Sequence, residues 1–128
     1  MKESMKEAKF SSKELVFLAA NAADDKKAIN TQIIDIRTVT DVADYLMVTS
    51  GDNPAQLKAI ASEIEDQLSK MGQEPAHKEG KHGDKWFLFD YGDVVIHIIG
   101  TDAREYYKLE EFWSHAMLVN KDEWLKVA

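Results

Sequence analysis

Four histidines are the first residues of this 128-residue chain that could bind a metal or transfer a proton. His77 and His82 are five positions apart in a stretch that also contains two glycines, whereas His97 and His115 each stand alone. A zinc site needs three or four converging ligands, and cysteine, one of its common ligands, is absent. The spacing therefore favours four unrelated histidines, and we expect neither a metal nor a cofactor.

Aspartates could hold Mg²⁺ for phosphoryl transfer, and five of them lie near turns or strand ends: Asp35, Asp41, Asp44, Asp90 and Asp93. A nucleotidyltransferase would need Gly-Ser followed by two acids one residue apart on a strand. Here the order is Ser50-Gly51, and a helix signal follows it. Phosphate-binding glycine loops and a Gly-x-Ser-x-Gly nucleophile motif are also absent. We therefore predict a protein that is not an enzyme, with a nucleotidyltransferase-like enzyme as the alternative.

Aromatic side chains among acids are the remaining unusual feature. Segment 86–113 holds eight of the chain's twelve aromatic residues together with six acids. Tyr and Trp dominate binding hot spots, and acids suit a basic partner, so this segment predicts a protein-binding face. The competing interpretation is that most of these rings are core. We apply it to Phe87, Phe89 and Phe112, and expect Tyr91 and Tyr107 to be exposed.

The charge balance limits the partner. Lys and Arg total 16 against 23 Asp and Glu, a formal net charge of −7, which argues against nucleic acid as the main ligand. No apolar run reaches the roughly 18 residues of a membrane span, and residues 1–9 resemble no targeting signal. We expect a soluble, cytoplasmic protein without membrane contact.

Hydrophobic spacing and caps predict the elements that position these residues. Helices are expected over 11–27, with a capping box of Ser11 and Glu14, and from Asn53 to Gly72. Strands are expected at 31–37, 45–49, 74–77, 85–91 and 94–99, the last two joined by a hairpin. The first should place Ile34 and Ile36 on one face, and the second alternates little, which predicts a central strand covered on both faces. The strand at 74–77 should lie at an edge, because Pro75 has no N–H to donate, and 78–85 should be a loop.

A last helix is expected from Thr101, with a capping box of Asp102 and Glu105, and a short tail helix within 120–128. The order predicts an α/β fold, a single domain with a mixed sheet of about five strands flanked by helices. Its expected limits are a flexible N-terminus at 1–9, the domain at 10–118 and a tail at 119–128.

Four runs of the sequence resemble the ribosomal silencing factor family, also called RsfS or Iojap: DYLMVTSG at 44–51, QLKAIA at 56–61, WFLFDYGDVVIH at 86–97 and REYYKLEEFW at 104–113. The resemblance covers about residues 30 to 116. It implies a nucleotidyltransferase-like fold without catalytic acids. It also implies binding to the large ribosomal subunit through its protein numbered fourteen (L-fourteen), which blocks joining with the small subunit and represses translation.

The resemblance implies a partner-binding face on the motif residues. We place it on Trp86, Asp90, Tyr91, Asp93, Arg104, Tyr107, Glu110 and Trp113, and secondarily on His97. A homodimer of the free protein, formed through the same aromatic face, is a further alternative.

Overall fold

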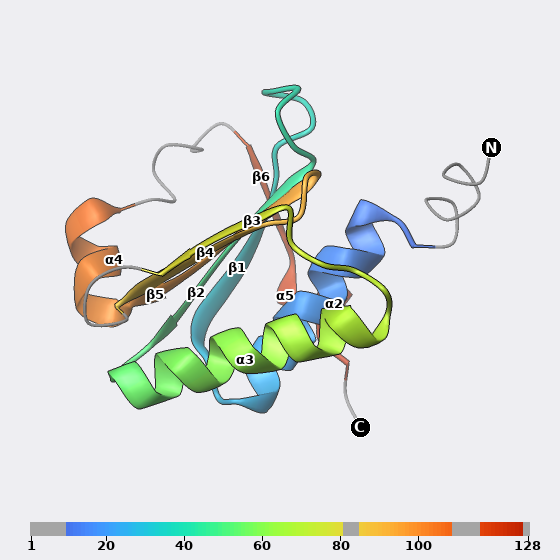
Figure 1. The fold of residues 1–128 in the computed structure, drawn as a ribbon. Helices are drawn as coiled ribbons and strands as arrows, with labels where there is room; N and C mark the ends of the chain where they lie inside the picture. Colours follow the sequence, from blue (N-terminus) through green and yellow to red (C-terminus); the bar gives the residue numbers. More distant parts are fainter. Residues whose placement is uncertain (1–9, 81–84, 109–115, 127–128) are drawn as a thin grey trace.

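Figure 1 shows the computed structural model of the chain, which describes residues 10–80, 85–108 and 116–126. Helix α2 (Ser12–Asp25) begins at the predicted capping box. The Glu14 N–H donates to Ser11 Oγ at 3.1 Å, and the Ser11 N–H donates to Glu14 Oε1 at 2.8 Å. The helix ends two residues before the predicted Lys27, because Lys27 adopts a φ of 61° that no helix continues.

Helix α3 (Pro54–Lys70) also begins as predicted, at an Asn-Pro pair. Asn53 Oδ1 accepts from the Gln56 N–H at 2.8 Å, and Pro54 occupies the first helical position. The five buried side chains of α3 recur at helical spacing and form one apolar stripe: Leu57, Ile60, Ala61, Ile64 and Leu68. This stripe fixes α3 on the sheet.

Six strands form one mixed sheet in the order β3-β4-β5-β2-β1-β6. Their bounds are β1 (Ile29–Asp35), β2 (Tyr45–Gly51), β3 (His77–Gly80), β4 (Trp86–Asp90), β5 (Val94–Gly100) and β6 (Met117–Val119). Strands β2 and β5 are parallel, and every other neighbouring pair is antiparallel. All seven residues of β2 are buried, which confirms the prediction of a central strand covered on both faces.

The two faces of the sheet are covered differently. Helices α2 and α3 lie side by side on one face, here called the helix face (Figure 1). Its core includes Ile33, Met47, Ile96 and Ile98, all fully buried. A second cluster of residues on the strands and just beside them lies on the opposite face, here called the second face: Ile34, Ile36, Ala43, Leu46, Val48 and Ile99. The predicted division of 31–37, with Ile34 and Ile36 on one side, is therefore confirmed.

The predicted edge strand at 74–77 is displaced along the chain. The structure places it at β3 (His77–Gly80), paired with β4, and most of this strand lies where the sequence predicts a loop. Pro75, which has no N–H to donate, precedes the strand, and the Ala76 N–H donates to the Asp90 carbonyl at 2.8 Å. The strand is polar and mostly exposed, so the sequence contains no hydrophobic alternation that would have predicted it.

The C-terminal third departs most from expectation. Helix α4 (Thr101–Tyr107) begins after Gly100 without a side-chain cap, so the predicted capping box of Asp102 and Glu105 is wrong. It ends at Lys108, whose φ of 49° and ψ of 54° are left-handed. A sixth strand, β6, follows, one more than the five that we expected.

The short helix α5 (Lys121–Trp124) confirms the predicted tail helix. Trp124 is only 2 % exposed and belongs to the helix-face core. Asn21 of α2 secures the segment, because its Nδ2 donates to the Trp124 carbonyl at 2.7 Å and its Oδ1 accepts from the Lys126 N–H at 2.8 Å. The boundary expected between 118 and 119 falls inside β6.

Candidate functional site

The predicted partner face includes two residues that contact each other on the second face. The Trp86 indole Nε1–H donates to His97 Nδ1 at 3.1 Å, between β4 and β5. Their ring centroids are 5.9 Å apart at an interplanar angle of 55°. Since an indole N–H can only donate, His97 Nδ1 must be unprotonated, and the neutral ring carries its proton on Nε2. Burial lowers the pKa of His97, which also favours the neutral form.

Three further predicted residues lie at the turn that joins β4 to β5. The Asp90 side chain organises it, because its Oδ1 accepts from the Gly92 N–H at 2.8 Å, and Gly92 has a φ of 91°. The Asp93 carbonyl accepts from the N–H groups of Asp44 and Tyr45, which holds the turn against the start of β2. The Asp93 residue itself is exposed. The turn therefore presents a carboxylate on a rigid support.

Tyr91 lies less open to solvent than we expected. It is half-buried and packs against the helix-face core, with its ring edge-on to Phe89 at 6.4 Å between centroids. Its hydroxyl oxygen is buried and has no hydrogen-bond partner among the described residues. Burial raises the pKa of Tyr91 well above its usual range, with a smaller contribution from Glu65 and Glu74. The expectation of an exposed ring at this turn is corrected.

Arg104 lies in the interior. It is 6 % exposed, and its Nη1 donates to the Asn30 carbonyl at 2.6 Å and to Ser50 Oγ at 3.0 Å. These bonds connect α4 to β1 and to the end of β2, which are 74 and 54 positions away in sequence. In the structure the Arg104 side chain thus joins elements of the fold.

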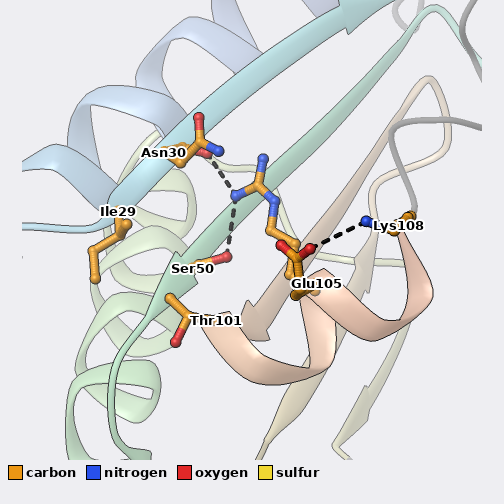
Figure 2. Close-up of a pocket in the computed structure, with 7 residues that line it drawn as sticks. Ile29, Asn30, Ser50, Thr101, Glu105 and Lys108 are labelled. Atoms are coloured by element: carbon orange, nitrogen blue, oxygen red, sulfur yellow. Dashed lines mark hydrogen bonds and ion pairs between the residues drawn. The ribbon is translucent and has the colours of Figure 1, made fainter.

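The Arg104 side chain also lines a cavity of about 280 Å³ (Figure 2). The cavity lies where the parallel strands β2 and β5 both end, and it is lined by Ile29, Asn30, Ser50, Thr101, Arg104, Glu105 and Lys108. Lys108 Nζ and Glu105 Oε2 form an exposed ion pair at 3.1 Å. Among the described lining residues, Arg104 and Lys108 are cationic and Glu105 carries the one carboxylate. Of these lining residues, the sequence indicated only Arg104. The one other feature of the sequence that could have located the cavity is that strands 45–49 and 94–99 could pair in parallel.

The predicted residues therefore divide into separate groups. Trp86 and His97 meet on the second face, whereas Asp90, Tyr91 and Asp93 lie at the other end of β4, roughly 13 Å along the strand. Tyr107 belongs to α4, but its side chain is outside the described part, as are Glu110 and Trp113 entirely. Phe87 and Phe89 contribute to the helix-face core, as predicted, and Phe112 lies outside the described residues.

The described residues form neither a metal-binding cluster nor a membrane-spanning helix. Across residues 10–80, 85–108 and 116–126, no group of three or more His, Asp or Glu side chains is placed to hold a metal ion. In the same ranges no helix is long and apolar enough to cross a membrane.

Known proteins resemble this chain in sequence over most of its length. The model of the family described as "Ribosomal silencing factor during starvation" matches residues 9–127. Ribosomal silencing factor RsfS of Bacillus subtilis is 39 % identical over 110 residues, covering 86 % of this chain and 93 % of the relative. A mouse protein named "Mitochondrial assembly of ribosomal large subunit protein 1" is 34 % identical over 74 residues, 56 % of this chain and 32 % of its own length.

A solved structure gives the same result for the fold. The crystal structure of a protein from Chromobacterium violaceum superposes with a TM-score of 0.78 at 30 % identity, covering 82 % of this chain and 88 % of that one. The fold and the sequence agree over nearly the whole length, so this chain belongs to the ribosomal silencing factor family.

Proposed function

We propose that this protein is a non-catalytic translational repressor in the cytoplasm that binds the large ribosomal subunit through its protein L-fourteen. Bound there, it blocks joining with the small subunit. The observation that carries the proposal is the family match over residues 9–127. The name of the mouse relative refers to the large ribosomal subunit, which supports that subunit as the partner.

The second face and the β4–β5 turn are the surfaces that we propose for the partner. The second face places half-buried Trp86 beside His97, and no described helix lies along it except α4 at its end. An indole that is already held by a hydrogen bond loses little side-chain entropy when a partner covers it. Trp86 is therefore the described residue that we expect to contribute most to affinity.

The acids would orient the complex. With a net charge of −7, the protein would be steered towards a basic protein surface and repelled by exposed ribosomal RNA. Asp93 is the exposed acid at the turn. Charge pairs at the rim of an interface mainly affect the association rate and its salt dependence.

The first experiment measures subunit joining. Purified large subunits are incubated with saturating protein, small subunits are added, and joined ribosomes are separated by sedimentation. We expect the protein to sediment with large subunits and to reduce the joined fraction. Full joining at saturation would refute the proposed block, and absence from the large-subunit peak would refute ribosome binding as well.

A charge reversal tests the acidic turn. Asp93→Lys should slow association with isolated L-fourteen, most visibly at low salt, because it replaces an attractive charge with a repulsive one. Asp25→Lys is the matched control, since it makes the same charge change at the exposed C-terminal end of α2. Equal effects of both variants would show that net charge, and not the turn, governs binding.

A homodimer of the free protein is a second candidate state. Met117 and Leu118 on edge strand β6 are 70 % and 59 % exposed, an unusual exposure for large apolar side chains. Sedimentation across a concentration series separates the two states. A dimer that survives Met117→Lys would show that it does not use this edge.

A further inference from the structure

A hydrogen bond joins Trp86, an aromatic residue of the proposed partner face, to a residue that can change its charge. Trp86 lies on β4 and His97 on the neighbouring strand β5, and both side chains lie on the second face. We propose that His97 is a positioning residue: its unprotonated Nδ1 holds the Trp86 indole in the orientation that the partner binds, and protonation of Nδ1 releases the indole. This inference deepens the proposed function and rests on it.

The bond between the two side chains restricts the orientation of the indole. In the strand register Trp86 stands opposite Ile99 and His97 stands opposite Leu88, so the bond runs diagonally between the two strands. The indole has a single N–H, which donates to His97 Nδ1 at 3.1 Å, and the two ring centroids are 5.9 Å apart. A hydrogen bond has a preferred direction as well as a length, so this one limits the rotation of the indole ring.

A restrained ring favours binding because Trp86 is half-buried in the free protein. A partner that covers this ring must fix whatever rotational freedom it retains, which lowers the affinity. The bond to His97 removes part of that freedom before the partner arrives. His97 therefore contributes to affinity through Trp86 and need not touch the partner itself.

Protonation of His97 removes the acceptor of this bond. A neutral imidazole has one nitrogen that donates and one that accepts, whereas an imidazolium donates from both. A proton on Nδ1 would point at the indole N–H, so two donors would face each other. Burial lowers the pKa of His97, so the change occurs below the usual titration range of histidine. The indole is therefore held at neutral pH and released as the pH falls.

The groups around His97 connect the expected pH response to this ring. Leu88 of β4 and Val48 of β2 are its cross-strand neighbours, and neither side chain titrates. Asp102 and Glu105 of α4 are exposed. On the same side of the sheet, β3, β4 and α4 contribute charged or titratable side chains whose described contacts lie elsewhere: His77, Glu79, Asp90 and Arg104. Burial is the cause of the lowered pKa of His97, so the response follows the charge of this ring.

The first measurement follows the indole N–H of Trp86 by NMR, in the full chain without ribosomes. Trp86→Phe identifies its resonance among the three tryptophans. We expect this resonance to shift between pH 7.5 and 5.5 in step with the ring nitrogens of His97, whose proton should lie on Nε2 at the higher pH. Trp124, in the helix-face core, is the internal control and should not follow. A proton on Nδ1 at pH 7.5, or a Trp86 resonance that does not follow His97, would overturn the proposal.

The second measurement compares binding to isolated L-fourteen at pH 7.5 and 5.5. The parent should bind more weakly at the lower pH, and His97→Asn should lose less affinity between the two values. The asparagine Oδ1 is attached to Cγ, as Nδ1 is, so it can accept the indole N–H, and it does not titrate. His77→Asn is the matched control, because it removes a histidine from exposed strand β3, and it should keep the full pH dependence of the parent. Titration of L-fourteen itself is common to all three proteins.

A double-mutant cycle tests whether His97 acts through Trp86. His97→Leu removes the acceptor and should weaken binding at pH 7.5 about fivefold, the factor that corresponds to one ordinary hydrogen bond. In a Trp86→Phe background, which lacks the indole N–H, the same substitution should have no further effect. Additive effects would show that His97 contacts the partner directly and would refute the positioning role. Urea unfolding of each variant is measured first, and the NMR and His97→Asn measurements test the proposal even if His97→Leu does not fold.

The outcomes separate this inference from the proposed function. If the parent binds neither L-fourteen nor the large subunit at pH 7.5, the proposed function fails and this inference fails with it. If the parent binds and His97→Asn shows the same pH dependence as the parent, the positioning role fails and the proposed function stands.

Discussion

At the scale of single residues, the hydrogen bond from Trp86 determines the protonation state of His97. A protonated imidazole would direct an N–H at the indole N–H, and burial already disfavours the charged ring. The protein therefore places an imidazole whose pKa is lowered by burial in contact with the aromatic residue that we propose for the partner.

This pair predicts a pH dependence of stability. The pKa of His97 is lower in the folded than in the unfolded chain, so the unfolded state binds the proton more tightly. Its contribution to stability is present above the unfolded pKa of about 6.5 and is lost as the pH falls through the folded pKa. The free energy of unfolding, measured in urea at pH 7.5 and at pH 5.5, should fall less between the two pH values for His97→Gln than for the parent.

The control for this measurement is His77→Gln, on exposed strand β3. It should retain the full loss of stability between the two pH values. If His97→Gln retains it as well, His97 does not carry the effect.

Tyr91 provides a second prediction at this scale. Its buried hydroxyl has no partner within the described part of the chain, and an unsatisfied buried group of this kind costs about 1–3 kcal/mol. Tyr91→Phe should therefore leave the free energy of unfolding unchanged or raise it by about 1 kcal/mol. If the hydroxyl serves the ribosomal partner, the same variant weakens that complex. A clear loss of stability in urea would show that the hydroxyl is satisfied within the fold.

At the scale of the elements, helix caps explain why α2 and α3 lie where the sequence predicts them. In each helix a side chain just before the first turn accepts a hydrogen bond from a backbone N–H of that turn. Residues adjacent in sequence therefore predict where the helix begins. Helix α4 differs, because no side chain caps its start and Lys108 ends it in a left-handed conformation. It is held by Arg104, which binds residues far away in sequence.

The capping box of α2 predicts the effect of a substitution. Ser11→Ala removes the acceptor for the Glu14 N–H and should lower the free energy of unfolding by about 1 kcal/mol. Ser62→Ala, at an exposed position inside α3, makes the same chemical change and should be neutral or slightly stabilising. Urea unfolding of the two variants checks the sign. Equal effects would contradict a role for the cap.

At the scale of the whole molecule, the C-terminal segment belongs to the core. Strand β6 completes the sheet beside β1, and Trp124 is buried in the helix-face core near α2. Residues at the two ends of the described chain therefore stabilise each other.

Removal of residues 121–128 should be strongly destabilising. The loss of Trp124, which is 2 % exposed, opens the helix-face core and should cost about 3–5 kcal/mol. Trp124→Ala should reproduce most of this loss. Glu123→Ala, at an exposed side chain of the same short helix, should have little effect. A truncated chain as stable as the parent in urea would contradict the role of α5.

The sequence by itself determined the family, the two long helices with their caps, the central position of 45–49 and the β4–β5 hairpin. Each of these depends on neighbouring residues or on a regular hydrophobic period. Only the tertiary structure decided the polar edge strand β3, the short strand β6, the burial of Arg104 and Tyr91, and the cavity at the ends of β2 and β5. These depend on contacts between distant segments, such as Arg104 with Asn30, 74 positions apart, which no local pattern encodes.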